Sequence, residues 1–301
     1  MFTLAHISDP HLGPLPPVRP SELMNKRFFG WLSWVRRRRA LHRPEVLAAL
    51  AADLAGVAPD HLVITGDLTN IALPGEFALV GRWLESLGAP EAVSVVPGNH
   101  DAYVAVPWET SLAKWSAFMA CEEAGTAAAG PEAFPYVRRR GPAAIIGLSS
   151  AQPTPLFQAH GTLGQAQLER LDAVLRRLGK EGRFRVVLLH HPPSLEKVVW
   201  RKRLVDAQAF RAVIADAGAE LILHGHDHTF GSETIPGPGG PVPVVGVPSA
   251  SAGRGGGRHP IAHYQLYRIE KAGNTWRIEV AARGFDAASG AFGEVRSYAI
   301  L

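Results

Sequence analysis

The sequence predicts an α/β protein with two facing mixed β-sheets flanked by helices. Short runs rich in Val, Ile and Leu alternate along the 301 residues with longer segments of helical spacing, which is the pattern of sheet and helix layers. The last three predicted strands follow one another without an intervening helix, so one sheet or one edge is expected to be antiparallel. The Gly/Pro-rich stretches are too short to link domains, and residues 1–301 are therefore predicted to form a single domain.

The strands are predicted at the short apolar runs, and the helices between them where apolar residues recur at helical spacing. The predicted strands are 2–8, 61–65, 93–96, 143–148, 186–189, 220–223, 242–247, 263–269 and 276–281. The predicted helices are 44–55, 74–87, 108–120, 165–178 and 206–217. Pro44 and Pro74 each stand at a first helical position, where the N–H that proline lacks would have no partner in the helix.

A long insertion, residues 13–43, separates the first strand from the first of these helices. It opens with prolines and continues with an apolar stripe at helical spacing. The stripe consists of Met24, Phe28, Trp31, Leu32 and Val35, and Phe29 and Trp34 widen it. Lys26 and Arg27 stand at its start, and residues 36–39, all arginine, follow it directly. The insertion is therefore predicted to contain an amphipathic helix with basic residues at both ends.

The composition excludes several classes of protein. With 47% hydrophobic and 19% charged residues, the chain is not disordered, collagen-like or a small disulfide scaffold. The single cysteine, Cys121, forms neither an intrachain disulfide nor a paired-Cys zinc site, which favours a reducing compartment. No stretch reaches the roughly 20 uninterrupted apolar residues of a membrane-spanning helix, and no signal peptide precedes the first strand, so a cytoplasmic protein is expected.

Polar motifs follow five of the predicted strands. They are Asp9-Pro10-His11, Gly66-Asp67, Gly98-Asn99-His100-Asp101, His190-His191-Pro192 and His224-Gly225-His226-Asp227-His228. Open α/β sheets place their ligands and catalytic loops at the carboxyl ends of the strands. Side chains that are far apart in the sequence are therefore expected to converge on one rim of the protein.

The chemistry of these motifs points to metal ions. Asp and Asn oxygens occur together with His nitrogens and without thiolates, a donor set that suits Mn²⁺, Fe²⁺, Co²⁺ or Zn²⁺. In Asp9-x-His11 and His226-x-His228 the two side chains can point to the same side of an extended segment, so each pair can reach one locus. Asp67 stands alone after a glycine that permits a tight turn, as a bridging carboxylate requires. The donors suffice for two ions about 3.5–4 Å apart.

The five motifs, in this order, resemble those of the calcineurin-like metallophosphoesterase superfamily, and the resemblance extends from Asp9 to His228. It implies a four-layer α/β/β/α fold and two divalent ions, Mn²⁺, Fe²⁺ or Zn²⁺. The first ion would be held by Asp9, His11, Asp67 and His228. The second would be held by Asp67, Asn99, His190 and His226, with Asp67 as the bridge and His190 favoured over His191 by the pattern His-x-Pro. By the same resemblance, His100 would stabilise the transition state or protonate the leaving oxygen, and Asp101 would orient its imidazole.

The activity that the resemblance implies is hydrolysis of a phosphate ester by a hydroxide that bridges the two ions. A small soluble phosphodiester is the preferred substrate, because the motifs and the chain length look most like the branch with bacterial cyclic-nucleotide and glycerophosphodiester phosphodiesterases. The alternative is a membrane-associated hydrolase of a lipid or lipid-linked nucleotide pyrophosphate, of the UDP-diacylglucosamine hydrolase type. A nuclease is disfavoured because no nucleic-acid module is recognisable, and a non-catalytic binding protein because every ligand position and His100 are present.

The insertion starts directly after the Asp9-x-His11 motif, so it is expected to reach the active-site mouth and to shape substrate choice. Its apolar stripe either packs on the protein's own surface as a cap or, through residues 21–43, lies on an anionic membrane with its arginines at the lipid phosphates. A contact with a partner protein or a second copy is a third arrangement. Residues 19–43 hold eight Lys or Arg and one Glu, a net charge of +7, whereas the whole chain carries +4. The remainder is therefore mildly acidic.

Overall fold

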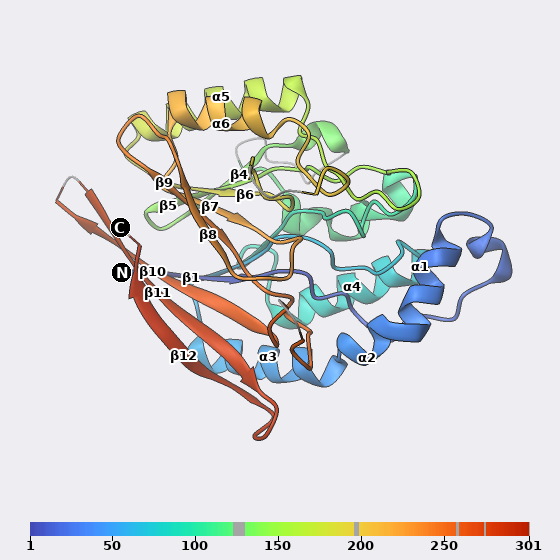
Figure 1. Cartoon of the computed structure of the whole chain (residues 1–301). Coiled ribbons are helices and arrows are strands. Elements are labelled where there is room, and N and C mark those ends of the chain that lie inside the picture. The colour runs from blue at the N-terminus through green and yellow to red at the C-terminus, as the bar shows by residue number, and fades with distance from the viewer. Residues whose placement is uncertain (123–129, 196–198, 257–258, 274, 301) are drawn as a thin grey trace.

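In the computed structural model, two six-stranded β-sheets face each other and helices cover their outer faces (Figure 1). The structure describes residues 1–122, 130–195, 199–256, 259–273 and 275–300. The first sheet has the order β12-β11-β10-β1-β2-β3. Its strands are β1 (Phe2–Ile7), β2 (His61–Ile64), β3 (Val93–Val95), β10 (His263–Ala272), β11 (Thr275–Asp286) and β12 (Ala291–Ala299). Strands β1, β2 and β3 are parallel, whereas β10 pairs antiparallel with β1 and begins an antiparallel run to β12.

The second sheet has the order β4-β5-β6-β7-β9-β8. Its strands are β4 (Tyr136–Arg140), β5 (Ala143–Gly147), β6 (Phe184–Leu188), β7 (Leu221–His224), β8 (Gly231–Ile235) and β9 (Val242–Gly246). The four central strands are parallel, and β4 and β8 pair antiparallel at the two edges. Both sheets are thus mixed, as predicted.

Two apolar clusters hold the layers together. Strand β6 contributes to both, because neighbouring side chains of a strand point to opposite faces of the sheet. Val186 belongs to the cluster between the two sheets, together with Ile64 of β2. Val187 belongs to the cluster that packs the second sheet against α5 (Gln165–Lys180) and α6 (Ala207–Ala217).

Helices α3 (Pro44–Val57) and α4 (Pro74–Leu87) cover the outer face of the first sheet (Figure 1). Each begins with proline at the first helical position, as the sequence predicts. On the opposite side, α5 buries Leu168, Leu171, Leu175 and Leu178, whose spacing places them on one face of the helix. The order helix, sheet, sheet, helix confirms the predicted four-layer fold.

Three strands that were not predicted, β4, β8 and β12, all lie at sheet edges. An edge strand pairs on one side only and carries charged side chains that discourage further pairing, so it lacks the continuous apolar run of a central strand. Strand β4 ends in three consecutive arginines, and β12 is mostly exposed. The antiparallel pairing expected of the last three predicted strands holds for β10 and β11, but β9 lies parallel to β7.

The helix predicted at 108–120 is instead two 3₁₀ turns, Trp108–Thr110 and Leu112–Met119. Its apolar residues Leu112, Trp115 and Phe118 occur at every third position, which is the period of a 3₁₀ helix. The sequence spacing fits both kinds of helix, and the structure adopts the tighter one.

The insertion forms a helical arm that we define as residues 20–41. It consists of a 3₁₀ turn (Pro20–Leu23), α1 (Arg27–Ser33), a π-helical turn (Trp34–Arg38) and α2 (Arg39–Leu41). None of the helices in the described residues combines the length and the apolar character needed to cross a bilayer.

Candidate metal centre

All seven predicted ligand residues lie at one rim of the two sheets, just beyond the carboxyl ends of strands. Asp9 and His11 follow β1, Asp67 follows β2, Asn99 follows β3, His190 follows β6, and His226 and His228 follow β7. Six of these residues are buried and His228 is partly exposed toward a cleft. The structure therefore brings together side chains from both sheets, as the convergence of parallel strands requires.

The first group of ligand atoms contains Asp9, His11 and His228. The Nε2 atom of His228 lies 3.1 Å from Oδ1 of Asp9 and 3.2 Å from Nε2 of His11. Asp67 joins the group through Oδ2, which is 3.8 Å from Nε2 of His11. Because metal–nitrogen and metal–oxygen bonds are about 2.0–2.2 Å long, ligand atoms on one ion lie about 3–4 Å apart, and these spacings fit one ion.

The second group contains Asn99, His190 and His226. The Oδ1 atom of Asn99 lies 2.8 Å from Nδ1 of His226 and 3.1 Å from Nε2 of His190. These two ring nitrogens are 3.3 Å apart. Asp67 joins this group through its other oxygen, Oδ1, which is 3.4 Å from Nε2 of His190. The two carboxylate oxygens of Asp67 thus face two different groups, which is the geometry of a bridging ligand.

The backbone at the site adopts conformations that only the surrounding fold can maintain. Five of the seven residues have positive φ angles: Asp9 at 51°, His11 at 40°, Asp67 at 55°, His226 at 74° and His228 at 53°. This left-handed region is unfavourable for residues other than glycine, and such strain concentrates at functional sites. The motif glycines have a steric role as well, since a Cβ atom at Gly225 would collide with Asp9 and one at Gly98 with Asp67.

Two of the histidines are held by backbone carbonyls behind the site. Nδ1 of His11 lies 3.1 Å from the carbonyl oxygen of Thr69, and Nδ1 of His190 lies 2.7 Å from that of Thr65. A proton on each Nδ1 would be donated to these oxygens, so both Nε2 atoms present lone pairs to the centre. Oδ1 of Asp9 is buried and accepts no hydrogen bond within the described residues. The donor set therefore fits divalent cations.

His191 is held away from this centre. Its Nδ1 lies 2.7 Å from Oγ of Ser150 and its Nε2 lies 3.0 Å from the carbonyl oxygen of Ala159. Both ring nitrogens therefore have other partners, whereas Nε2 of its neighbour His190 faces the ligand atoms described above. The geometry agrees with the choice of His190.

The structure does not support the predicted role of Asp101. Its carboxylate accepts hydrogen bonds from the backbone N–H groups of Thr69 and Gly98, both at 2.8 Å, and of Leu68 at 3.3 Å. Asp101 therefore ties the loop after β2 to the loop after β3. The imidazole of His100 is positioned by a different group, the carbonyl oxygen of Asn70, at 2.5 Å from its Nδ1.

The charges at the site shift its pKa values strongly. Burial, reinforced by the guanidinium of Arg38, lowers the pKa of His100 to about 3. Burial also opposes protonation of His190, but the Asp67 carboxylate outweighs it and raises the pKa of His190 to about 9, so a metal ion would take the place of the proton on Nε2. Burial likewise disfavours ionisation of Asp67, yet the surrounding histidines hold its pKa well below the usual range. Asp67 is thus a carboxylate that stays ionised although it is buried.

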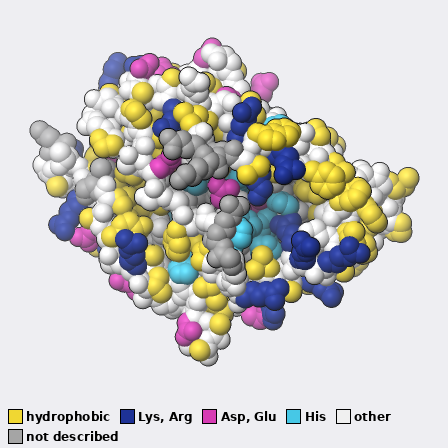
Figure 2. All heavy atoms as spheres, viewed as in Figure 1, with side chains coloured by type: hydrophobic (Ala, Val, Ile, Leu, Met, Phe, Trp, Pro, Cys, Tyr) yellow, Lys and Arg dark blue, Asp and Glu magenta, His cyan; other side chains and the backbone are white. Residues whose placement is uncertain are grey.

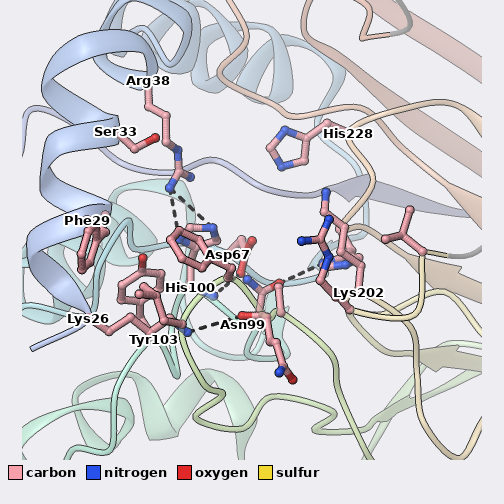
Figure 3. Close-up of a pocket in the computed structure, with 18 of the residues that line it drawn as sticks. Lys26, Phe29, Ser33, Arg38, Asp67, Asn99, His100, Tyr103, Lys202 and His228 are labelled. Atoms are coloured by element: carbon pink, nitrogen blue, oxygen red, sulfur yellow. Dashed lines mark hydrogen bonds between the residues drawn. The ribbon is translucent and has the colours of Figure 1, made fainter.

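Two residues of the insertion reach the site although no motif contains them. The guanidinium of Arg38 lies against His11. It also lies against His100, as Figure 3 shows. The ring of His42 lies 4.5 Å from that of His11, and a ligand nitrogen of His42 lies within 4.8 Å of those of His11 and His228. Sequence reasoning predicted that the arm approaches the site but had no signal that singled out these two residues.

A cleft of about 630 Å³ opens above the centre. Its floor includes Asp67 and Asn99, and the arm forms one wall through residues such as Phe29 and Ser33 (Figure 3). Residues 156–159 also line it, together with Val199, Arg201 and Lys202. The arm therefore borders the active-site cleft, as predicted from its position after the first motif.

Comparison with known proteins agrees with this geometry. Residues 2–230 match the family model described as calcineurin-like phosphoesterase. The chain belongs to this family. Its membership confirms the resemblance that the five motifs predicted.

A relative from Synechococcus sp., named "Probable cyclic nucleotide phosphodiesterase", is 32% identical over 184 residues, which span 60% of this chain and 62% of the relative. A dimetal phosphatase from Danio rerio has a similar structure, with a TM-score of 0.66 at 13% identity and coverage of 99% of this chain and 98% of that one. A purple acid phosphatase from yellow lupin seeds has a TM-score of 0.61 at 11% identity, covering 99% of this chain and 53% of that one. These two likenesses show that the fold is shared.

Proposed function

We propose that this protein is a dinuclear-metal-dependent phosphodiesterase that hydrolyses a small soluble phosphate ester. The observation that carries the proposal is the position of Asp67, whose two oxygens face two separate groups of ligand atoms. The family match and the name of the Synechococcus relative support a phosphodiester as the substrate.

Each metal would take the residues of one group. Asp9, His11 and His228 would hold the first ion, Asn99, His190 and His226 the second, and Asp67 both. When bound, two such ions lower the pKa of a water molecule and neutralise phosphoryl oxygens. His100 lies beside the first group and has its ring fixed by the carbonyl of Asn70, so it is positioned to stabilise the phosphoryl group or the leaving oxygen.

Substitution of Asp67 and of His100 distinguishes the residues that bind metal from those that act in catalysis. We expect Asp67→Ala to lose both bound metal and turnover of bis-p-nitrophenyl phosphate, because it removes one ligand from each ion. His100→Ala is expected to keep both ions and to lower kcat by roughly 10²–10⁴-fold. Metal content is measured by plasma mass spectrometry and turnover with Mn²⁺ present, with Asp172→Ala on the exposed face of α5 as the control. Full activity of Asp67→Ala would rule out the proposal.

A specific observation favours a second candidate, a membrane-associated hydrolase of a lipid or lipid-linked nucleotide. Two exposed aromatic side chains line the cleft, Phe29 (46% exposed) and Phe157 (72%). Phe28 is 43% exposed and its ring lies 5.5 Å from that of Phe29, and Trp200, which follows the lining residue Val199 in the sequence, is 61% exposed. The rings of Phe29 and Phe157, from two different segments, are 6.0 Å apart. Figure 2 shows hydrophobic side chains beside Lys and Arg on this face. Such a combination suits an anionic lipid surface.

Vesicle binding decides between the two candidates. The second candidate predicts sedimentation with phosphatidylglycerol vesicles but not with phosphatidylcholine vesicles, and loss of sedimentation in the double variant Phe28→Ser, Phe157→Ser. Val295→Ser on β12, which removes an equally exposed apolar side chain at a sheet edge, is the matched control. Absence of binding to anionic vesicles would contradict the membrane-associated candidate and favour a soluble substrate.

A further inference from the structure

One arginine of the four at the end of the arm differs from its neighbours. Arg36, Arg37 and Arg39 are exposed, whereas Arg38 is partly buried and lines the cleft. Its Nη2 lies 2.8 Å from Nδ1 and 3.2 Å from Nε2 of His11. Its Nη1 lies 3.2 Å from Nδ1 of His100 (Figure 3). The guanidinium therefore lies between a ligand of the first metal group and the residue assigned to transition-state stabilisation.

The π-helical turn explains why Arg38 faces inward. The backbone N–H of Arg39 donates to the carbonyl oxygen of Trp34, five residues earlier, so the turn contains one more residue than an α-helical turn. Ser33 and Arg38, also five residues apart, both line the cleft. In a regular α-helix Arg38 would instead share a face with Trp34, four residues before it. Turns of this kind occur frequently at functional sites.

The arm is fixed to the protein at both ends of the helix that carries Arg38. Near its start, Nε of Arg27 donates to the carbonyl oxygen of Ile71 at 3.0 Å, and Nζ of Lys26 donates to Oγ1 of Thr154 at 2.9 Å. Just beyond its end, Nδ1 of His42 lies 2.8 Å from Oγ of Ser251. The backbone that carries Arg38 is therefore held beside the cleft.

The chemistry of this position indicates an anion. A guanidinium has five N–H donors and no lone pair, so it cannot ligate a cation. Within the described residues no carboxylate forms an ion pair with Arg38, although such pairs are present for several other arginines. The planar fork of donors matches phosphoryl oxygens, and an anion between the guanidinium and the metal ions would be attracted by both.

We propose that Arg38 is a catalytic residue that binds a non-bridging oxygen of the substrate's phosphoryl group. This inference rests on the proposed phosphodiesterase function. Negative charge on those oxygens increases as the attacking oxygen approaches phosphorus, so a guanidinium placed there stabilises the transition state more than the ground state. The insertion then contributes to the chemistry as well as to the wall of the cleft.

The test compares Arg38→Ala and Arg38→Lys with Arg37→Ala, which removes the same side chain from an exposed neighbouring position. For each metal-loaded protein, the affinity for inorganic phosphate is measured by calorimetry, metal content by mass spectrometry and kcat/KM with bis-p-nitrophenyl phosphate. For Arg38→Ala we expect phosphate binding to weaken at least about tenfold and kcat/KM to fall roughly 10²–10³-fold with metal content unchanged. Arg38→Lys is expected to be intermediate, and Arg37→Ala to remain within about twofold of the unsubstituted protein.

Added guanidinium ions distinguish a direct role from a structural one. They should restore part of the kcat of Arg38→Ala and have no effect on Arg37→Ala. Phosphate affinity and kcat/KM of Arg38→Ala equal to those of Arg37→Ala would overturn the inference, and so would loss of metal from Arg38→Ala. If the unsubstituted protein cleaves no phosphodiester while Arg38→Ala still weakens phosphate binding, the proposed function fails and the assignment of Arg38 as an anion ligand stands.

Discussion

Asp67 and Asp101 are both buried carboxylates of the site, but their surroundings give them different properties. Asp67 faces several histidine rings, and its pKa is held well below the usual range although burial opposes ionisation. Burial, and next the charge of Asp67, raise the pKa of Asp101 to about 7, against the effect of three backbone N–H donors. The hydrogen bonds of Asp101 therefore connect loops. Asp67 accepts a hydrogen bond at Oδ1 from the backbone N–H of His100 at 2.7 Å, and its two oxygens still face the two groups of ligand atoms.

A prediction at the residue scale follows for Asp101→Asn. The amide group presents only one oxygen, so at least one of the three backbone N–H groups loses its acceptor, and we expect the free energy of unfolding to fall by about 1–3 kcal/mol. Asp206→Asn is a matched control that does not line the cleft, and Asp206 likewise accepts hydrogen bonds from backbone N–H groups, those of Leu163 and Gly164. Urea unfolding measures both. A reduced kcat with unchanged stability in Asp101→Asn would instead support an orienting role toward His100.

At the scale of elements, the arm packs tightly against the body of the protein at Gly30. A Cβ atom there would lie 2.5 Å from Cγ2 of Ile71 and 2.8 Å from the hydroxyl oxygen of Tyr103. Both distances are far below van der Waals contact. The arm can therefore border the cleft only if this position has no side chain, and this close contact explains a glycine within α1.

We expect Gly30→Ala to displace α1, to change KM and the order of preference among phosphodiester substrates, and to lower the melting temperature. Gly56→Ala in α3 is the control, because a Cβ atom at Gly56 would meet nothing within 4 Å. There alanine should be neutral or stabilise the protein by up to about 1 kcal/mol through its higher helix propensity. Thermal unfolding and steady-state kinetics check both variants. Equal melting temperatures and kinetic constants for the two variants would show that α1 accommodates a side chain at position 30.

At the scale of the whole molecule, the core holds histidines that are neutral when folded. Burial, and next the charges of Arg140 and Arg138, lower the pKa of His61 to about 3, and its Nε2 lies 2.8 Å from Oγ of Ser94. In the unfolded chain the same residue titrates near its ordinary pKa of about 6.5. Between these values the unfolded state binds more protons, so the stability contributed by neutral His61 is present above pH 6.5 and lost as the pH falls toward 3.

His61→Gln should therefore make the free energy of unfolding less dependent on pH below about 6.5. Below pH 6.5 we expect the slope of unfolding free energy against pH to be shallower than in the unsubstituted protein. The difference should reach up to about 1.4 kcal/mol per pH unit, which is the slope that the uptake of one proton gives. Urea unfolding at pH 7.5, 6.0, 5.0 and 4.5 measures it. If the curves of unfolding free energy against pH were parallel for the two proteins, His61 would be protonated in the folded state at low pH, contrary to the expectation.

The sequence alone was enough to predict the central strands and the residues that converge at their ends. Apolar runs determine where buried strands form, and parallel strands necessarily end at the same edge, so the positions of Asp9, Asp67 and His228 followed from local pattern. The edge strands β4, β8 and β12 could not be predicted in this way, because exposure removes the apolar pattern that marks a strand.

Tertiary structure decided which of several equivalent residues face the site. Four consecutive arginines are identical in sequence, and only the π-helical turn, held by contacts at both ends of the arm, directs Arg38 into the cleft. Likewise, the partner of Asp101 depends on how two loops meet rather than on its place beside His100. Residue type and spacing determine which chemistry is available, whereas packing between distant segments determines which side chain faces the reacting group.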